Sequence, residues 1–261
     1  HLWLPEAHVE APTAGSIILA GVLLKLGSYG FLRFSLPLLP LASIFFTPLV
    51  YTVAVVSIIF TSFTAIRQTD FKRIIAYTSI AHMNLVVIGI FSFNLIGLEG
   101  SILQSLSHGF VASALFLIIG IVYDRHKTRV VQYYSGLASV MPVYTLFFFF
   151  FTLANIIFPG IIYFIGEFLI LVGCVKVNKT VAFFSATGIV FSGIYSLWLF
   201  NRVCFGNLKT QYIGKFLDLN TREVLIFSPL VLGTLGVGLW PDIFSKCYHI
   251  TVNDLLELLY F

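Results

Sequence analysis

Long apolar runs, interrupted only by scattered small or polar residues, recur along most of this chain. Six of them have roughly the 20 residues that an α-helix needs to cross the hydrocarbon core of a bilayer. Their limits lie near residues 14–36, 44–66, 73–93, 99–122, 181–204 and 222–240. The pattern therefore predicts an all-α, polytopic transmembrane helix bundle.

A further apolar stretch, residues 140–176, fits neither one straight crossing nor two. As a continuous helix it would be about 55 Å long, whereas the hydrocarbon core is about 30 Å thick. Asn155, Pro159 and Gly160 lie near its middle, where a proline removes a backbone hydrogen bond. We expect one discontinuous helix that leaves α-helical geometry around residues 156–163, which brings the count to about seven crossings.

Basic residues in the connections support this count and orient the chain. With the stretch as one crossing, ten basic residues lie on one side and four on the other; as two crossings it gives nine and five. The ten are Arg67, Lys72, Arg73, Arg125, Lys127, Arg129, Arg202, Lys209, Lys215 and Arg222, and the four are Arg33, Lys176, Lys179 and Lys246. The bias predicts the N-terminus and loops 67–72, 124–139 and 205–221 on the positive side, and the C-terminus opposite.

The end of the chain differs from the rest. Its sequence SKCYHITVNDLLELLYF alternates apolar and polar residues near helical spacing and is too polar to span a bilayer. We expect a helix that lies along the membrane surface or against a neighbouring protein. The chain then divides into a transmembrane bundle, residues 1–240, and a C-terminal helix or tail, residues 241–261.

Composition excludes several classes of soluble protein. Hydrophobic residues make up 59% of the chain, charged residues only 10%, and the mean hydropathy is +0.99, whereas soluble domains carry about 25% charged residues. The net charge of +4 comes from short loops, so no basic patch suited to nucleic acid is present. Cys174, Cys204 and Cys247 have no metal or disulfide spacing. The sequence shows no phosphate-binding glycine loop, metal constellation or nucleophile–base pair.

Two ionisable residues lie deep inside apolar stretches. Lys25 lies about eleven residues into the first stretch, and Glu167 follows the Pro159–Gly160 break by seven residues. A charge at such depth is costly and is usually retained to move ions or protons. An apolar environment disfavours the charged form, so each group can exchange a proton when its surroundings change. The structural alternatives are a lysine paired with a carboxylate on another helix, and a glutamate that holds the broken helix together.

Two histidines are candidates for a link between these groups. His82 lies in the unusually polar third stretch, and His108 shares a helical face with Ser101, Gln104 and Ser105 by i, i+3 and i+4 spacing. Such a face suits a line of hydrogen-bonded water, and histidine titrates near neutral pH. The sequence therefore predicts a proton relay, with the alternative of interior histidines that only satisfy hydrogen bonds.

Four segments point to a known family: HLWLPEAHVEAPTAGSIILAGVLLKLGSYGFLRFSLP, DFKRIIAYTSIAHMNLV, SHGFVASALFLIIGIVYDRHKTR and GEFLILVG. In this order and spacing they resemble the chain 4 family of respiratory NADH–ubiquinone oxidoreductase (complex I), most closely its plant and algal mitochondrial members. The resemblance runs nearly end to end. It covers about the C-terminal half of the family, from the loop before its eighth helix through its fourteenth.

The resemblance implies an antiporter-like subunit of the membrane arm of complex I, in the mitochondrial inner membrane with its positive side facing the matrix. Lys25 would be the central lysine of the hydrophilic axis and Glu167 the terminal proton carrier on the broken helix. His82 and His108 would be the histidines that link them. One segment departs from the family: residues 159–164 read PGIIYF, where a small-polar break such as PGTSSF is usual.

The implied function is proton translocation coupled to NADH:ubiquinone reductase chemistry in other subunits. Those subunits would bind NADH, FMN, the iron–sulfur clusters and ubiquinone, with no cofactor in this chain. The expected partners are the other membrane-arm subunits and the lipid bilayer. The family's helix-five glutamate and helix-seven lysine have no counterpart here, and the chain begins on His1. We therefore expect an upstream portion or a separate chain to carry that half.

Two alternatives remain open. One is a subunit of a multi-chain Na⁺/H⁺ antiporter, which would share the fold and the lysine. The other is a structural remnant that supports the membrane arm without pumping. The presence of both Lys25 and Glu167 argues against the remnant, because leucine at either position would cost less to bury.

Overall fold

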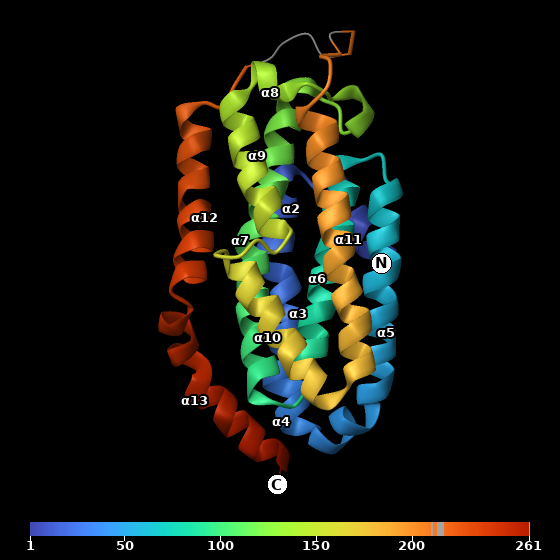
Figure 1. Ribbon diagram of the computed structural model, residues 1–261, viewed down its shortest axis with the longest axis vertical. Helices are drawn as coiled ribbons and strands as arrows, with labels where there is room; N and C mark the ends of the chain where they lie inside the picture. The colour runs from blue at the N-terminus through green and yellow to red at the C-terminus, as the bar shows by residue number, and fades with distance from the viewer. Residues whose placement is uncertain (210, 213–216, 261) are drawn as a thin grey trace.

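The computed structural model describes residues 1–209, 211–212 and 217–260. Over these residues the chain is a bundle of helices without any named strand; one isolated bridge pairs Asp70 with Val130. The long helices run roughly along the longest axis of the molecule (Figure 1). The predicted all-α fold is confirmed.

Six helical segments are long and apolar enough to cross a membrane. They are Thr13–Leu38, α5 (Pro40–Arg67), α6 (Phe71–Ile90), α7 (Leu95–His126), α11 (Lys179–Cys204) and α12 (Thr221–Leu239). The first combines α2 (Thr13–Ile18), α3 (Leu24–Gly30) and α4 (Leu36–Leu38) with the π-helical turns η1 (Leu19–Leu23) and η2 (Phe31–Ser35). Each predicted span is a helix, although α7, with 32 residues, extends beyond its predicted limits.

The discontinuous helix is also confirmed. Helix α9 (Pro142–Asn155) and helix α10 (Ile162–Val177) are separated by residues 156–161, which are not helical. Two residues of this break have positive φ, Ile157 at 72° and Gly160 at 92°. Glycine adopts such a conformation readily, whereas a β-branched isoleucine does so at a cost. The break lies about halfway along the bundle (Figure 1), so it opens the helix deep inside the molecule.

The long connections gather at one end of the bundle, which we call the long-loop end: residues 68–70, 127–136 and 205–209. There η3 (Val131–Tyr133) and α8 (Leu137–Val140) lie close to the third connection (Figure 1). Lys209 Nζ donates to the Gln132 carbonyl at 2.6 Å. The three loops predicted to share a side thus lie at the same end; residues 210 and 213–216 of the third fall outside the described residues.

The two terminal helices pack against the sides of the bundle. Helix α1 (Trp3–Glu10) contacts α6, where Glu6 forms a 2.8 Å ion pair with Arg73. Helix α13 (Pro241–Tyr260) runs toward the end opposite the long loops and buries Val252 and Leu256 in a core cluster (Figure 1). The tail is therefore helical over its described residues; its position at a membrane surface remains a prediction.

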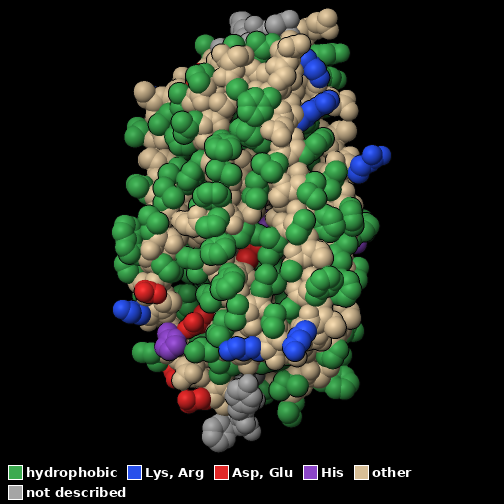
Figure 2. Space-filling view, viewed as in Figure 1, with side chains coloured by type: hydrophobic (Ala, Val, Ile, Leu, Met, Phe, Trp, Pro, Cys, Tyr) green, Lys and Arg blue, Asp and Glu red, His purple; other side chains and the backbone are tan. Residues whose placement is uncertain are grey.

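The outer surface is apolar over most of its length. Hydrophobic side chains cover much of the visible face, and lysine and arginine lie mainly toward its two ends (Figure 2). Large exposed side chains on α5 alone include Phe45, Phe46 and Val56. A broad apolar band with charges at its ends is what a lipid or protein neighbour would cover.

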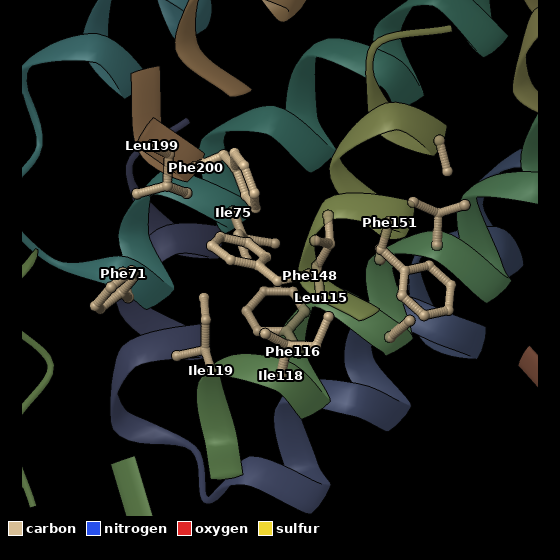
Figure 3. Packing of buried hydrophobic residues seen from close by; sticks show 14 of the residues in the cluster. Phe71, Ile75, Leu115, Phe116, Ile118, Ile119, Phe148, Phe151, Leu199 and Phe200 are labelled. Atoms are coloured by element: carbon tan, nitrogen blue, oxygen red, sulfur yellow. The ribbon is translucent and has the colours of Figure 1, made fainter. Parts of the chain in front are cut away.

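The interior near the long-loop end is filled by aromatic and aliphatic side chains. Figure 3 shows part of this packing, with Phe71 and Ile75 on α6, Phe148 on α9, and Leu199 and Phe200 on α11, all members of one core cluster. All five are at most 7% exposed. We call these five residues the apolar layer.

Candidate functional site

Close contact between α7 and α10 positions the acidic end of the site. A Cβ built on Gly166 of α10 would lie 2.7 Å from Gln104 Oε1 and 2.9 Å from the Gln104 backbone. A Cβ on Gly100 of α7 would lie 2.8 Å from the Ile170 backbone nitrogen. Only glycine allows this approach, and the approach brings Glu167, next to Gly166, against α7.

Gly166→Ala tests this packing. The added methyl group would meet backbone atoms that cannot move independently, so we expect the variant to destabilise the subunit by about 1–3 kcal/mol. Thermal unfolding of the purified complex measures the effect. Gly236→Ala is a matched control, because a Cβ there meets nothing within 4 Å. Equal unfolding temperatures for the two variants would contradict the packing argument.

The Glu167 carboxylate is buried, at 1% exposure, and has two polar partners. Its Oε1 lies 2.8 Å from His82 Nδ1 of α6 and accepts a hydrogen bond from Gln104 Nε2 of α7 at 2.7 Å. Ser107 Oγ donates to Gln104 Oε1 at 3.1 Å, which fixes the orientation of the amide. Three helices thus hold one carboxylate in place.

The Lys25 ammonium lies at the other end of the site. Its Nζ is 2.6 Å from His108 Nδ1 and also donates to the Ala20 carbonyl in the π-helical turn η1. Among the ion pairs of the described residues, none involves Lys25, so the alternative of a lysine paired with a carboxylate of this part of the chain is not supported. Its side chain is half-buried and borders an open groove of about 700 Å³ between the first span, α7, α12 and α13.

The two histidines lie between these ends. Their ring centroids are 6.2 Å apart, and both side chains are at most 5% exposed. In each ring Nδ1 faces a charged residue, whereas Nε2 is buried without a hydrogen-bond partner in the described structure. The Tyr163 ring lies 5.0 Å from His82 and 6.5 Å from His108. The four predicted residues therefore form one row, Lys25–His108–His82–Glu167.

The PGIIYF departure has a visible consequence. Ile161, Ile162 and Tyr163 are all buried, whereas Phe158 is exposed. The tyrosine that replaces a small residue of the break thus packs against both histidines and covers the middle of the row. The sequence alone gave no indication of this contact.

The serines of α7 take different partners. Ser105 lines the groove beside Lys25 and donates to the Ile102 carbonyl of its own helix. Ser107, which lies outside the predicted polar face, donates to Gln104 Oε1. Ser101 is buried but donates to the Leu98 carbonyl of its own helix. A helix of 3.6 residues per turn spreads i, i+3 and i+4 over a wide arc, and the neighbouring helices decide which part of that arc faces the row.

A further buried histidine lies outside the spans. His8 of α1 is 0% exposed and stacks on Phe116 with ring centroids 4.6 Å apart. Burial, and then the positive charges of Lys72 and Lys25, lower the pKa of His8 to about 4. Lys72, one of the basic residues of the predicted connections, is the second residue of α6; it is 2% exposed and its Nζ donates to the Ala11 carbonyl at 2.7 Å. Neither position has the apolar flanks that reveal a buried charge in a sequence.

Among the described residues, no three or more His, Cys, Asp or Glu side chains are grouped so that they could hold a metal ion. The row itself consists of groups that can exchange protons. An ammonium, two imidazoles and a carboxylate follow one another, each able to bind and release a proton.

Comparison with known proteins identifies close relatives. Residues 1–193 match the family described as NADH:quinone oxidoreductase/Mrp antiporter, transmembrane. NADH-ubiquinone oxidoreductase chain 4 of Marchantia polymorpha is 60% identical over 98% of this chain and 52% of its own length. NADH-quinone oxidoreductase subunit M of Rhodobacter capsulatus is 48% identical over 98% of this chain and 50% of its own length. This chain thus spans about half the length of the curated relatives it matches.

Solved structures share the fold. A chain of respiratory complex I from Thermus thermophilus with bound NADH superimposes with a TM-score of 0.89 and 29% identity, covering 98% of this chain and 54% of that one. A chain of the Mrp complex from Dietzia sp. superimposes with a TM-score of 0.71 at 17% identity, over 98% of this chain and 54% of that one. At this low identity the similarity concerns the fold alone.

Proposed function

Because this chain belongs to the NADH:quinone oxidoreductase/Mrp antiporter transmembrane family, we propose that it translocates protons as part of a membrane-arm subunit of respiratory NADH:ubiquinone oxidoreductase. The observation that carries the proposal is the row Lys25–His108–His82–Glu167. Contacts of 2.6 Å and 2.8 Å join each charged end to its histidine. Helix bundles rarely retain such residues at membrane depth without a transport role.

The proton would move along the row by successive transfers between neighbours. Lys25 gives a proton to His108 Nδ1, and the resulting imidazolium can release a proton from Nε2 on the far side of its ring. His82 can accept at its own free Nε2 and pass a proton from Nδ1 to Glu167 Oε1. The ring centroids are 6.2 Å apart, so the transfer between the two rings would need a bridging water molecule or a movement of one ring.

The free energy of this transfer depends on the opposite charges of Lys25 and Glu167. Ionised Lys25 and Glu167 stabilise each other across the histidines, whereas transfer of one proton makes both neutral. In a low-dielectric interior the balance between these two states responds to any nearby charge. A redox reaction elsewhere in the complex can therefore drive the transfer through charged groups that approach or leave the row.

The redox reaction itself belongs to other subunits in this proposal. NADH, FMN, the iron–sulfur clusters and ubiquinone would bind there, and this chain would contact other membrane-arm subunits and lipid. The location would be the mitochondrial inner membrane. The long-loop end would face the matrix, and the C-terminus would face the intermembrane space.

Orientation can be tested by labelling. In inside-out inner-membrane vesicles, a cysteine introduced at Lys127 should react with a membrane-impermeant maleimide, because the long-loop end would then face the solution. A cysteine at Lys179, at the opposite end of the bundle, should react only in mitoplasts. The reverse pattern would overturn the assignment of sides.

A multi-chain Na⁺/H⁺ antiporter is the second candidate, since the matching family includes such proteins. Purification of the native assembly distinguishes the two. Complex I requires that NADH-oxidising, iron–sulfur-containing subunits co-purify with this chain. An assembly that holds only antiporter subunits would refute the proposal. The subunit list would also show which polypeptide carries the length that the relatives have beyond this chain.

A further inference from the structure

A second buried polar region lies next to Glu167, on α11. Tyr195 is 1% exposed, and its hydroxyl has no hydrogen-bond partner in the described structure. An unsatisfied buried hydroxyl is costly and marks a place where a water molecule or a function is expected. The Tyr195 hydroxyl is therefore a candidate site for bound water or for proton transfer.

Tyr195 lines two small cavities. The first is lined by His82, Glu167 and Tyr195, together with Ser185 and Ser192. The second is lined by Tyr195, Thr78, Thr152, Asn155 and Ser196. Each leaves about 10 Å³ for the centre of a water molecule, which is about the room that one water needs. Because Tyr195 borders both, it is the side chain through which a hydrogen-bonded chain would pass.

The second cavity leads away from the row toward the long-loop end. Thr78 precedes His82 by four residues on α6, which places it about 6 Å closer to that end. Asn155 is the last residue of α9, whose first residue lies at the long-loop end, and its Nδ2 donates to Ser196 Oγ at 2.9 Å. The last turn of α9, directly before the break, thus supplies Thr152 and Asn155 to the polar part of this cavity's lining.

The far wall of the second cavity is apolar. Ile75, Phe148 and Leu199 line it, and all three belong to the apolar layer seen in Figure 3. Water would have to cross several ångströms of closely packed hydrophobic side chains to reach the long-loop end. The cavity therefore shares Tyr195 with the cavity beside Glu167 and has apolar side chains toward the long-loop end.

We propose that Tyr195 is a proton-relay residue that connects Glu167 to the cavity around Asn155, and that the apolar layer gates this branch at the long-loop end. The proposal rests on the proposed function of the row. A tyrosine hydroxyl both donates and accepts hydrogen bonds. Its oxygen takes a proton from a protonated water (H₃O⁺) in one cavity, while its own proton passes to a water in the other. At the tyrosine oxygen one O–H bond forms as one breaks; the first hydronium becomes water, the second water becomes hydronium, and the side chain ends neutral.

Tyr195→Phe in the assembled complex tests the relay. The variant keeps the ring and removes the hydroxyl, so we expect proton pumping and the coupled quinone reduction to fall severalfold while assembly persists. The solvent deuterium isotope effect on turnover should rise, because proton transfer becomes slower. A role in packing alone would change neither the pumping nor the isotope effect.

Tyr51→Phe is the matched control. It also removes a buried tyrosine hydroxyl, which donates to the Phe91 carbonyl at 2.8 Å, but it lies outside both cavities. Pumping should match that of the unchanged complex. If Tyr195→Phe behaves like Tyr51→Phe, the relay is refuted.

A second variant and a reference separate the remaining outcomes. Thr78→Val makes one wall of the second cavity apolar at nearly constant volume. It should lower pumping less than Tyr195→Phe does, and the double variant should pump about as little as Tyr195→Phe alone. If the tyrosine variant does not assemble, normal pumping in Thr78→Val refutes the proposal. Glu167→Gln measured alongside tests the row: normal pumping there refutes the proposed function, whereas loss there with normal Tyr195→Phe refutes only the relay.

Discussion

Lys25→Ala should abolish most proton pumping, and the quinone reduction coupled to it should fall by about tenfold or more, since positioned proton donors contribute at least about 10²-fold to the steps they serve. The side chain supplies the proton that His108 Nδ1 accepts across 2.6 Å, and alanine leaves that position without a donor. Assembly should persist, because Lys25 is only half-buried and its removal opens no closed core.

Two further variants make this result specific. Lys25→Arg should restore little, because a guanidinium keeps its charge but does not readily release a proton. Lys176→Ala removes a lysine in the last turn of α10, away from the row, and should pump normally. Pumping is measured as acidification driven by NADH oxidation in reconstituted vesicles. If an assembled Lys25→Ala complex pumped fully, Lys25 would not be a proton carrier, and the alternative of a structural remnant that does not pump would replace the proposal.

Glu167→Gln should have a comparably large effect from the other end of the row. Glutamine has nearly the same shape and keeps a hydrogen-bonding oxygen for Gln104, so the three helices remain joined. It cannot take up or release a proton at pH 7, so transfer from His82 should stop. The expected result is an intact complex whose pumping falls by about tenfold or more, as for Lys25→Ala.

The control for this variant is Glu99→Gln on the same bundle. Glu99 also contacts a histidine, His249, at 2.5 Å, but it lies near α13 and outside the row. Its loss should leave the ratio of protons pumped to electrons transferred unchanged. Glu167→Asp should retain part of the activity, because the shorter side chain keeps a carboxylate but holds it farther from His82. Normal pumping in Glu167→Gln would exclude this residue as a carrier.

The membrane itself explains why so much of the fold follows from the sequence. A span must be apolar over about 20 residues and must satisfy its backbone within the helix, so the six long spans are readable one at a time. The same local physics predicts the break, because the length of residues 140–176 and Pro159 both conflict with a single straight helix. Lys25 and Glu167 are conspicuous for a similar reason, since a charge at that depth stands out against its apolar neighbours.

Only the tertiary structure determined the contacts between residues that are far apart in the sequence. Lys25 and His108 are 83 residues apart, and His82 and Glu167 are 85 apart, so no local pattern fixes which ring nitrogen faces which charge. The orientation of each helix is set by close contacts such as that of Gly166 with Gln104. For the same reason the sequence determined the spans, the break and the ionisable residues, but only packing determined that Ser107 bonds to Gln104 and that Tyr195, whose hydroxyl is unpaired in the described structure, lines a cavity together with Glu167.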